Sequence, residues 1–258
     1  MNKDSNHPGL KVCLTLIILS SVLSALFSYL TTSLLPGIDL LLGELFFVLP
    51  VIIYLRIRKH DIKTTFRANR VGNRIVGVSV LLGISFTVLV DELDRIIATF
   101  IEVPPEWHEL LSRVFTIDSF SDAIILFTAV VLFASVFEEM VFRGMLQQAF
   151  EQRVVPPKAL FSTALVFAFM HLFSPWTIQI LILGLILGYL AWRSNSIIPG
   201  IILHCFNNSF ALLFLNIQPE SMQWYNWNGH VYPPILVIAS GVAFYGLKWF
   251  HRHTEVET

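Results

Sequence analysis

The sequence predicts an all-α fold, a polytopic membrane helix bundle with about eight transmembrane helices. The first reason is composition, since the 258 residues are 55% hydrophobic and only 14% charged, and the mean hydropathy is +0.70. Such values are typical of integral membrane proteins. The second reason is that apolar runs of spanning length recur along the whole chain, separated by short polar segments. One membrane domain covering residues 1–258 is therefore expected.

The expected spans are apolar segments that end at charged or turn-forming residues: Val12–Leu30, Leu40–Leu55, Ile75–Val90, Ala123–Phe150, Ala159–Phe173, Ile178–Trp192, Ile197–Phe214 and Tyr232–Phe250. The first run is longer than a signal-peptide core, so we expect a retained helix. Between the third and fourth spans, Leu93–Ile101 and Trp107–Phe115 mix apolar and polar residues at helical spacing. These two segments predict amphipathic helices on the membrane surface.

Charge is distributed unevenly between the two sides of the predicted bundle. Seven of the 17 basic residues lie in the loop after the second span: Arg56, Arg58, Lys59, Lys63, Arg67, Arg70 and Arg74. This bias predicts a cytoplasmic loop, and with eight spans both termini are then cytoplasmic as well. The net charge of −1 gives no attraction for polyanions, so the expected surroundings are a lipid bilayer and not nucleic acid.

Three charged side chains interrupt the fourth span, namely Glu138, Glu139 and Arg143. Each charge at mid-helix opposes insertion by roughly 2.5 to 3.5 kcal/mol, so the group is expected to pair or to face a wet cavity. Glu139 and Arg143 are four residues apart and face one another, whereas Glu138 is rotated by about 100°. Glu138 is therefore the candidate general base. A purely structural Glu–Arg pair between helices is the alternative.

Two further polar pairs lie in later spans. Phe167 and His171 share one helix face, and so do His204 and Asn208. Amide hydrolysis by water needs a base and donors aimed at the developing oxyanion. Glu138 and His171 could activate the water, and His204 and Asn208 could donate to the oxyanion. A lone membrane histidine is as often an interhelical hydrogen-bond partner, but two histidines beside a Glu-Glu-Arg group favour a site.

The remaining features of the spans carry less information about function. Glu44 in the second span could line the cavity, although packing or a helix end explains it equally well. Gly184 and Gly188 form a GxxxG pair that predicts close helix packing. Cys13 and Cys205 are the two cysteines of the chain, and neither a disulfide nor a thiolate zinc site is expected from them. The fourth span is expected to extend to Phe150, which brings Glu138 toward the depth of His171.

In this order on successive helices, EExxxR (Glu138, Glu139, Arg143), FxxxH (Phe167, His171) and HxxxN (His204, Asn208) resemble the CPBP intramembrane protease family. That family, which includes the ABI proteins, groups CAAX prenyl endopeptidases with bacteriocin-processing and immunity-type proteins. The resemblance implies a glutamic endopeptidase with a catalytic core over residues 122–215. It implies that Glu138 and His171 activate water, that His204 and Asn208 form the oxyanion hole, and that Glu139 and Arg143 support activity.

The resemblance also bears on cofactors, partners and alternatives. Glu138, His171 and His204 could in principle bind zinc, but HExxH spacing is absent and a site without cofactor is expected. The expected partner is a peptide or protein substrate, possibly lipidated. A non-catalytic immunity-type interaction protein remains an alternative. A transporter is a further one, although no inverted repeat supports it.

Overall fold

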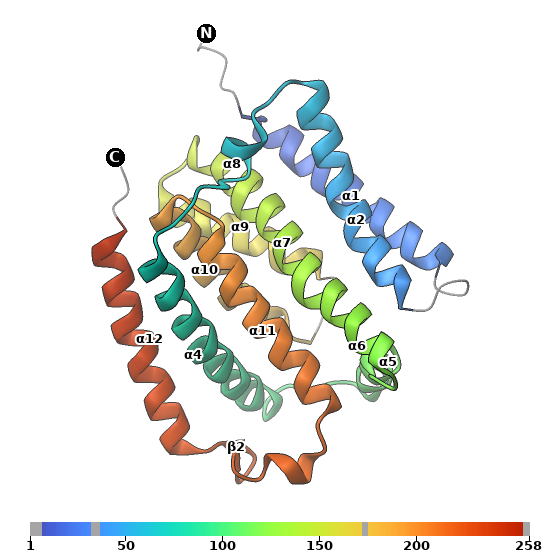
Figure 1. The fold of residues 1–258 in the computed structure, drawn as a ribbon, viewed down its shortest axis with the longest axis vertical. Coiled ribbons are helices and arrows are strands. Elements are labelled where there is room, and N and C mark those ends of the chain that lie inside the picture. Colours follow the sequence, from blue (N-terminus) through green and yellow to red (C-terminus); the bar gives the residue numbers. More distant parts are fainter. Residues whose placement is uncertain (1–6, 32–36, 172–174, 255–258) are drawn as a thin grey trace.

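A computed structural model describes residues 7–31, 37–171 and 175–254 as a bundle of long helices (Figure 1). The helices of the bundle are α1 (Leu10–Thr31), α2 (Ile38–Ile57), α4 (Asn73–Ala98), a composite helix over Phe120–Glu151, α9 (Pro156–Met170), α10 (Thr177–Ser194), α11 (Ile198–Asn216) and α12 (Pro233–His253). The shorter elements are α3 (Ile62–Thr65), α5 (Pro105–Phe115), the 3-10 turn η3 (Pro219–Met222), β1 (Asn226–Trp227) and β2 (His230–Val231).

The fold class agrees with the prediction. Among the described residues, seven helices are long and apolar enough to cross a membrane, and the 15-residue α9 is a shorter apolar helix. The two ends of the chain and α3 lie at one end of the bundle, and α5 and the β-hairpin lie at the other (Figure 1). The basic loop after α2 and residues 91–118, where seven acidic residues stand against two arginines, therefore lie at opposite ends of the bundle.

Proline and asparagine mark the ends of several bundle helices. Pro156, Pro199 and Pro233 each stand in the first two positions of a helix, where a missing N–H costs nothing. Asn195 ends α10 in the left-handed conformation, with φ 46° and ψ 38°. These local signals explain why the later helices begin and end within a few residues of the predicted limits.

The composite helix carries the first motif. It consists of α6 (Phe120–Leu126), the π-helical η1 (Phe127–Phe133), α7 (Ala134–Glu138), the π-helical η2 (Glu139–Leu146) and α8 (Gln147–Glu151). Its end at Glu151 confirms the extended fourth span. π-helical turns shift the backbone hydrogen bonds from i−4 to i−5 and are frequent at functional sites.

One helix prediction is wrong and its neighbour is confirmed. The segment Leu93–Ile101 forms no separate surface helix, because α4 continues without a break to Ala98. No proline or glycine interrupts the chain there, and Asp91 accepts an intrahelical hydrogen bond from Arg95 Nε at 3.0 Å. The second expected surface helix is present as α5.

Two helix pairs and one group of three helices form the frame around the composite helix. The hairpin α1–α2 packs along one side of it, α9 packs on α10, and α4 packs on α11 and α12. Gly184 and Gly188 lie on α10 where a Cβ would meet Ala164 at 3.2 Å and Gln147 at 2.9 Å, so the predicted packing role of GxxxG is confirmed. Within the composite helix, α7 contacts α11 and η2 contacts α9 and α10.

Candidate active site

The site is built around a buried ion pair. Arg143 Nη1 donates to Glu139 Oε1 at 2.7 Å, and both side chains are 0% exposed. The four-residue spacing predicted this pair. The Arg143 guanidinium also lies over the ring of Phe167, 4.1 Å from its centroid, and Nη2 donates to the carbonyl of Gly184 at 3.4 Å. The pair therefore joins the composite helix to α9 and α10.

The second contact of the pair reaches α11. His204 Nδ1 donates to Glu139 Oε1 at 3.3 Å, and His204 Nε2 lies 3.8 Å from Glu138 Oε2. Because a carboxylate only accepts hydrogen bonds, Nδ1 carries the hydrogen and Nε2 faces Glu138. Glu138 Oε2 is buried and has no hydrogen-bond partner within the described part of the chain. The two motifs EExxxR and HxxxN therefore meet at His204, with Glu138 as the less satisfied carboxylate.

A glycine on α11 makes this contact possible. A Cβ added to Gly200 would lie 2.6 Å from Glu139 Oε2, which is closer than real Cβ contacts come. Gly200 is one turn before His204 on the same helix face. The bare backbone therefore leaves room for the Glu139 carboxylate beneath the histidine ring.

The FxxxH motif is attached through an aromatic ring. Phe167 is fully buried and makes edge contacts with His171 and with His204, at centroid distances of 4.8 and 6.1 Å. His171 Nδ1 donates to the carbonyl of Phe167 at 2.9 Å. In the neutral ring this leaves Nε2 as an acceptor. His171 ends α9, so it belongs to the site by way of Phe167, while His204 contacts the two glutamates directly.

Asn208 is held by the first π-helical segment. Asn208 Nδ2 donates to the carbonyl of Val130 at 2.9 Å, and the Cys205 thiol donates to the carbonyl of Val131 at 3.3 Å. Both carbonyls belong to η1, where the altered hydrogen-bond register leaves backbone oxygens available. One hydrogen of the Asn208 amide remains for another acceptor.

Polar side chains continue from the ion pair toward the basic loop. Gln147 donates from Nε2 to Glu151 at 2.9 Å and to the carbonyl of Gly188 at 3.1 Å, and Arg67 forms a bidentate ion pair with Glu151. Glu139, Arg143, Gln147 and Glu151 thus stand at intervals of four residues. Four residues of an α-helix overshoot one turn by about 40°. The wider turns of η2 reduce that drift, so the four side chains stay on a common face. We call these four residues the polar ladder.

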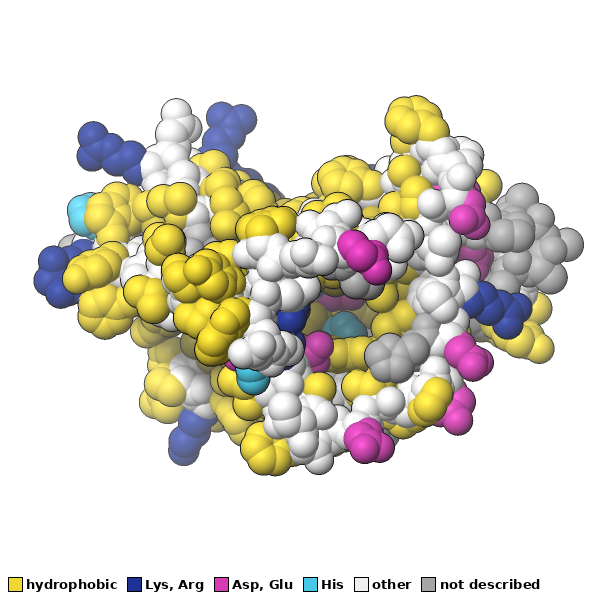
Figure 2. Space-filling model, turned by 90° about the horizontal axis from the view of Figure 1, so that it is seen from below, with side chains coloured by type: hydrophobic (Ala, Val, Ile, Leu, Met, Phe, Trp, Pro, Cys, Tyr) yellow, Lys and Arg dark blue, Asp and Glu magenta, His cyan; other side chains and the backbone are white. Residues whose placement is uncertain are grey.

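A cavity of about 490 Å³ adjoins this arrangement. Its lining includes Val130 and Asn207, the neighbours of the Asn208 contact, but not Glu138, His171 or His204. Viewed from the end that carries α5, the molecule is hollowed, with acidic side chains on the rim and a histidine side chain visible inside (Figure 2). The two glutamates are therefore packed against His204, and the open volume of the cavity lies beside them, at Asn207.

Glu44 and the possible metal ligands can also be located. Glu44 is the seventh residue of α2, near enough to Glu138 for the two carboxyl groups to interact, and it does not line the cavity described above. Within the described ranges, no three His, Cys, Asp or Glu side chains gather in an arrangement that could hold a metal ion. The alternative zinc set Glu138, His171 and His204 is not assembled as a ligand group. A site without cofactor stays a prediction.

Two supporting residues were missed in the sequence. Gly200 could have been found from its spacing, because it precedes His204 by four residues and so lies on the same helix face. A small residue at that position leaves room for a side chain that contacts the histidine. Gln147 likewise follows Arg143 by four residues and is fully buried. Their roles depend on which helices are neighbours, which spacing within one helix does not reveal.

Residues 103–210 match the family described as Type II CAAX prenyl endopeptidase Rce1-like, and this segment contains all three motifs. No curated protein and no solved structure matches the chain. The match agrees with the resemblance indicated by Glu138, Glu139, Arg143 and the two histidine motifs. The apolar helices and this match together describe a multi-pass integral membrane protein. The segment that carries the candidate site is therefore similar to the Rce1-like type II CAAX prenyl endopeptidase family.

Proposed function

We propose that this protein is an intramembrane endopeptidase that hydrolyses a peptide bond with water as the nucleophile. The observation that carries the proposal is the position of His204 between Glu138 and Glu139, next to a fully buried Arg143, inside the family-matched segment. Placing three charged side chains and a histidine inside membrane helices costs insertion free energy. Such groups are therefore expected to serve a function, and catalysis is one that they can serve.

In the proposed reaction, Glu138 takes a proton from water, and His171 Nε2 accepts a hydrogen bond from the same water. The water oxygen then adds to the carbonyl carbon, and the carbonyl π electrons move to its oxygen. When this tetrahedral species collapses, the C–N bond breaks and the proton held by Glu138 passes to the leaving nitrogen. The products are a carboxylic acid and an amine, so no metal or other cofactor is required.

His204 and Asn208 supply the proposed stabilisation of the oxyanion. In this scheme His204 donates to the oxyanion from Nε2 in its doubly protonated form, while Nδ1 donates to the Glu139 carboxylate. Asn208 donates the amide hydrogen that Val130 does not use. Removing one such donor typically lowers kcat by about 10²- to 10³-fold. Glu139 and Arg143 hold the histidine in position and do not touch the substrate in this scheme.

The proposed substrate is a peptide or protein at the membrane, with or without an attached lipid. The proposed orientation keeps the basic loop around Arg67 and both termini in the cytoplasm. A cysteine-accessibility experiment with single cysteines near each terminus, in a background without Cys13 and Cys205, tests this orientation. Labelling from the far side of the membrane would contradict it.

The decisive experiment compares the parent protein with Glu138→Gln in detergent against a peptide library analysed by mass spectrometry. Glu138→Gln keeps the shape of the side chain but removes the base, so cleavage should fall by about 10²- to 10⁴-fold. Glu109→Gln, at an exposed position on α5, is the matched control and should cleave normally. Cleavage by Glu138→Gln at the parent rate would refute the proposal and favour a non-catalytic interaction protein.

A further inference from the structure

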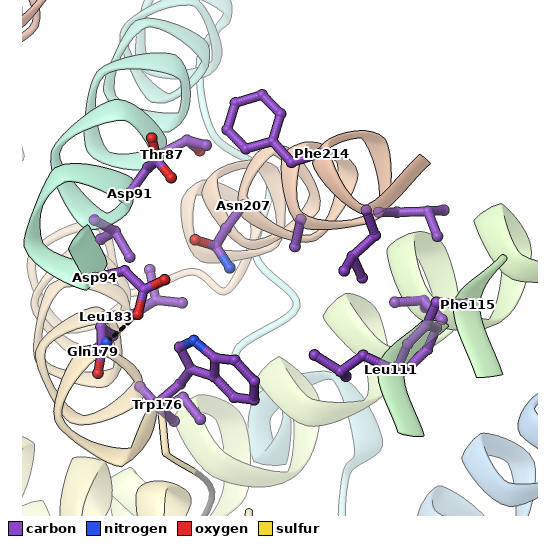
Figure 3. Close-up of a pocket in the computed structure, with 16 residues that line it drawn as sticks. Thr87, Asp91, Asp94, Leu111, Phe115, Trp176, Gln179, Leu183, Asn207 and Phe214 are labelled. Carbon is purple, nitrogen blue, oxygen red and sulfur yellow. Dashed lines mark hydrogen bonds between the residues drawn. The ribbon is translucent and has the colours of Figure 1, made fainter. Parts of the chain in front are cut away.

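The cavity beside the site has one polar wall and one apolar wall. In Figure 3, Thr87, Asp91 and Asp94 project from α4 on one side, and Leu111 and Phe115 of α5 lie opposite. Its volume, about 490 Å³, is within the range of clefts that bind small ligands or peptide side chains. The cavity is thus large enough to hold part of a substrate.

Two contacts join the cavity to the candidate active site. Val130, which lines the cavity, has the carbonyl that accepts from Asn208. Leu183, which also lines it, precedes Gly184, whose carbonyl accepts from Arg143. A peptide whose carbonyl oxygen reached Asn208 would therefore have a neighbouring side chain at the cavity.

The two carboxylates on the polar wall differ in their partners. Asp91 is neutralised, because its Oδ2 accepts from Arg95 Nε at 3.0 Å and from the Tyr225 hydroxyl at 2.8 Å. Asp94 forms no ion pair with any arginine or lysine in the ranges that the structure describes. Its hydrogen-bond donors, Gln179 and Trp176, are neutral, and Arg95 acts on it without direct contact, so a cation in the cavity could still form an ion pair with Asp94.

Two neutral side chains hold Asp94 in position on this wall. Gln179 Nε2 donates to Asp94 Oδ1 at 2.6 Å, as the dashed line in Figure 3 marks. Trp176, which also lines the cavity, donates a second side-chain hydrogen bond to Asp94. Gln179 is only 4% exposed, and its Oε1 is buried away from the cavity, so Gln179 orients the carboxylate and does not itself face a ligand. A carboxylate fixed in this way at the edge of an apolar cavity suits a cationic group with several N–H donors.

We propose that this cavity is a substrate side-chain subsite in which Asp94, oriented by Gln179, binds the cationic side chain of a lysine or arginine. The apolar wall formed by Leu111 and Phe115 would contact the stem of that side chain and an adjoining apolar residue. The inference rests on the proposed peptidase function and deepens it. It assigns the substrate class as apolar peptide segments with a basic residue close to the scissile bond.

Binding to an inactive protein tests the subsite separately from catalysis. The probe is a pentapeptide with one central lysine among leucines, and the comparison is the same peptide with glutamine in place of lysine. On the Glu138→Gln protein in detergent, the lysine peptide should bind roughly ten- to a hundredfold more tightly, as a charge-assisted hydrogen bond requires. Adding Asp94→Asn should abolish the difference, since asparagine still accepts from Gln179 but carries no charge.

The control is Asp118→Asn, the same change at an exposed position on the same end of the molecule. It should leave the lysine preference intact, which excludes a general attraction of the acidic rim. Equal binding of the two peptides, or a preference that survives Asp94→Asn, would overturn the inference. Cleavage by the parent protein answers a different question, because a lysine preference in binding without any cleavage would refute the peptidase function and leave the subsite standing.

Discussion

Gly200→Ala is the substitution that most directly probes how the site is held together. The added methyl would lie 2.6 Å from Glu139 Oε2. A carbon and an oxygen atom ordinarily stay about 3.3 Å or more apart. The Glu139 carboxylate would therefore have to move by roughly 0.7 Å, although it is fully buried and bonded to Arg143 and His204.

The size of the effect follows from that displacement. Overpacking a buried contact costs about 1–3 kcal/mol of unfolding free energy. Because Glu139 orients His204, cleavage should fall by roughly tenfold or more, since a misplacement of about 1 Å in an active site costs about 10²-fold. The change should act mainly on kcat, because neither Gly200 nor Glu139 is proposed to contact the substrate.

Gly241→Ala is the matched control, because Gly241 lies within α12 and a Cβ there has nothing within 4 Å. Both substitutions gain the same helix propensity, about 1 kcal/mol, so their difference isolates the contact with Glu139. Thermal unfolding in detergent and peptide cleavage measure the two effects. If Gly200→Ala were as stable and as active as Gly241→Ala, the structural role assigned to Glu139 would be wrong.

Two further predictions concern charged side chains. Arg143→Met should lower the unfolding free energy by about 3–5 kcal/mol, because it leaves Glu139 buried without its cation, and denaturant titration should detect the loss. Asp61, outside the spans, accepts from the Thr64 N–H at 2.7 Å, and this hydrogen bond lowers its pKa from the usual 3.8. The capped turn of α3 should therefore be stable above pH 4 and loosen as the pH falls through the lowered pKa, seen as a lower protection factor of the Thr64 amide against hydrogen exchange. A Thr64 protection factor that did not change with acid, or an Arg143→Met protein of unchanged stability, would contradict these assignments.

The sequence was most informative where a single helix determines the answer. Spans could be predicted because a chain in lipid must satisfy its backbone hydrogen bonds within each helix. The Glu139–Arg143 pair followed from four-residue spacing alone, and the length of the fourth span followed from its apolar run. The error at Leu93–Ile101 has the same origin, since polar residues after Val90 indicated a boundary while no residue actually breaks the helix there.

Contacts between helices were harder to predict. The need for groups that activate water paired Glu138 with His171, whereas the structure brings Glu138 and Glu139 to His204 and attaches His171 through Phe167. That difference depends on which helices are neighbours and on their depth. None of the three motifs predicts the π-helical segments η1 and η2. The cavity beside Asp94 forms where α4, α5, α10 and α11 meet, which the sequence of a single helix does not reveal.

The polar ladder has a mechanical consequence. A helix surrounded by hydrocarbon alone can spin about its long axis, because the solvent is alike on every side. Contacts with other elements hold the composite helix at all four residues of the polar ladder. His204 donates to Glu139, the Gly184 and Gly188 carbonyls accept from Arg143 and Gln147, and Arg67 pairs with Glu151. The composite helix therefore cannot rotate freely, and any motion that admits a substrate has to come from the helices that surround it.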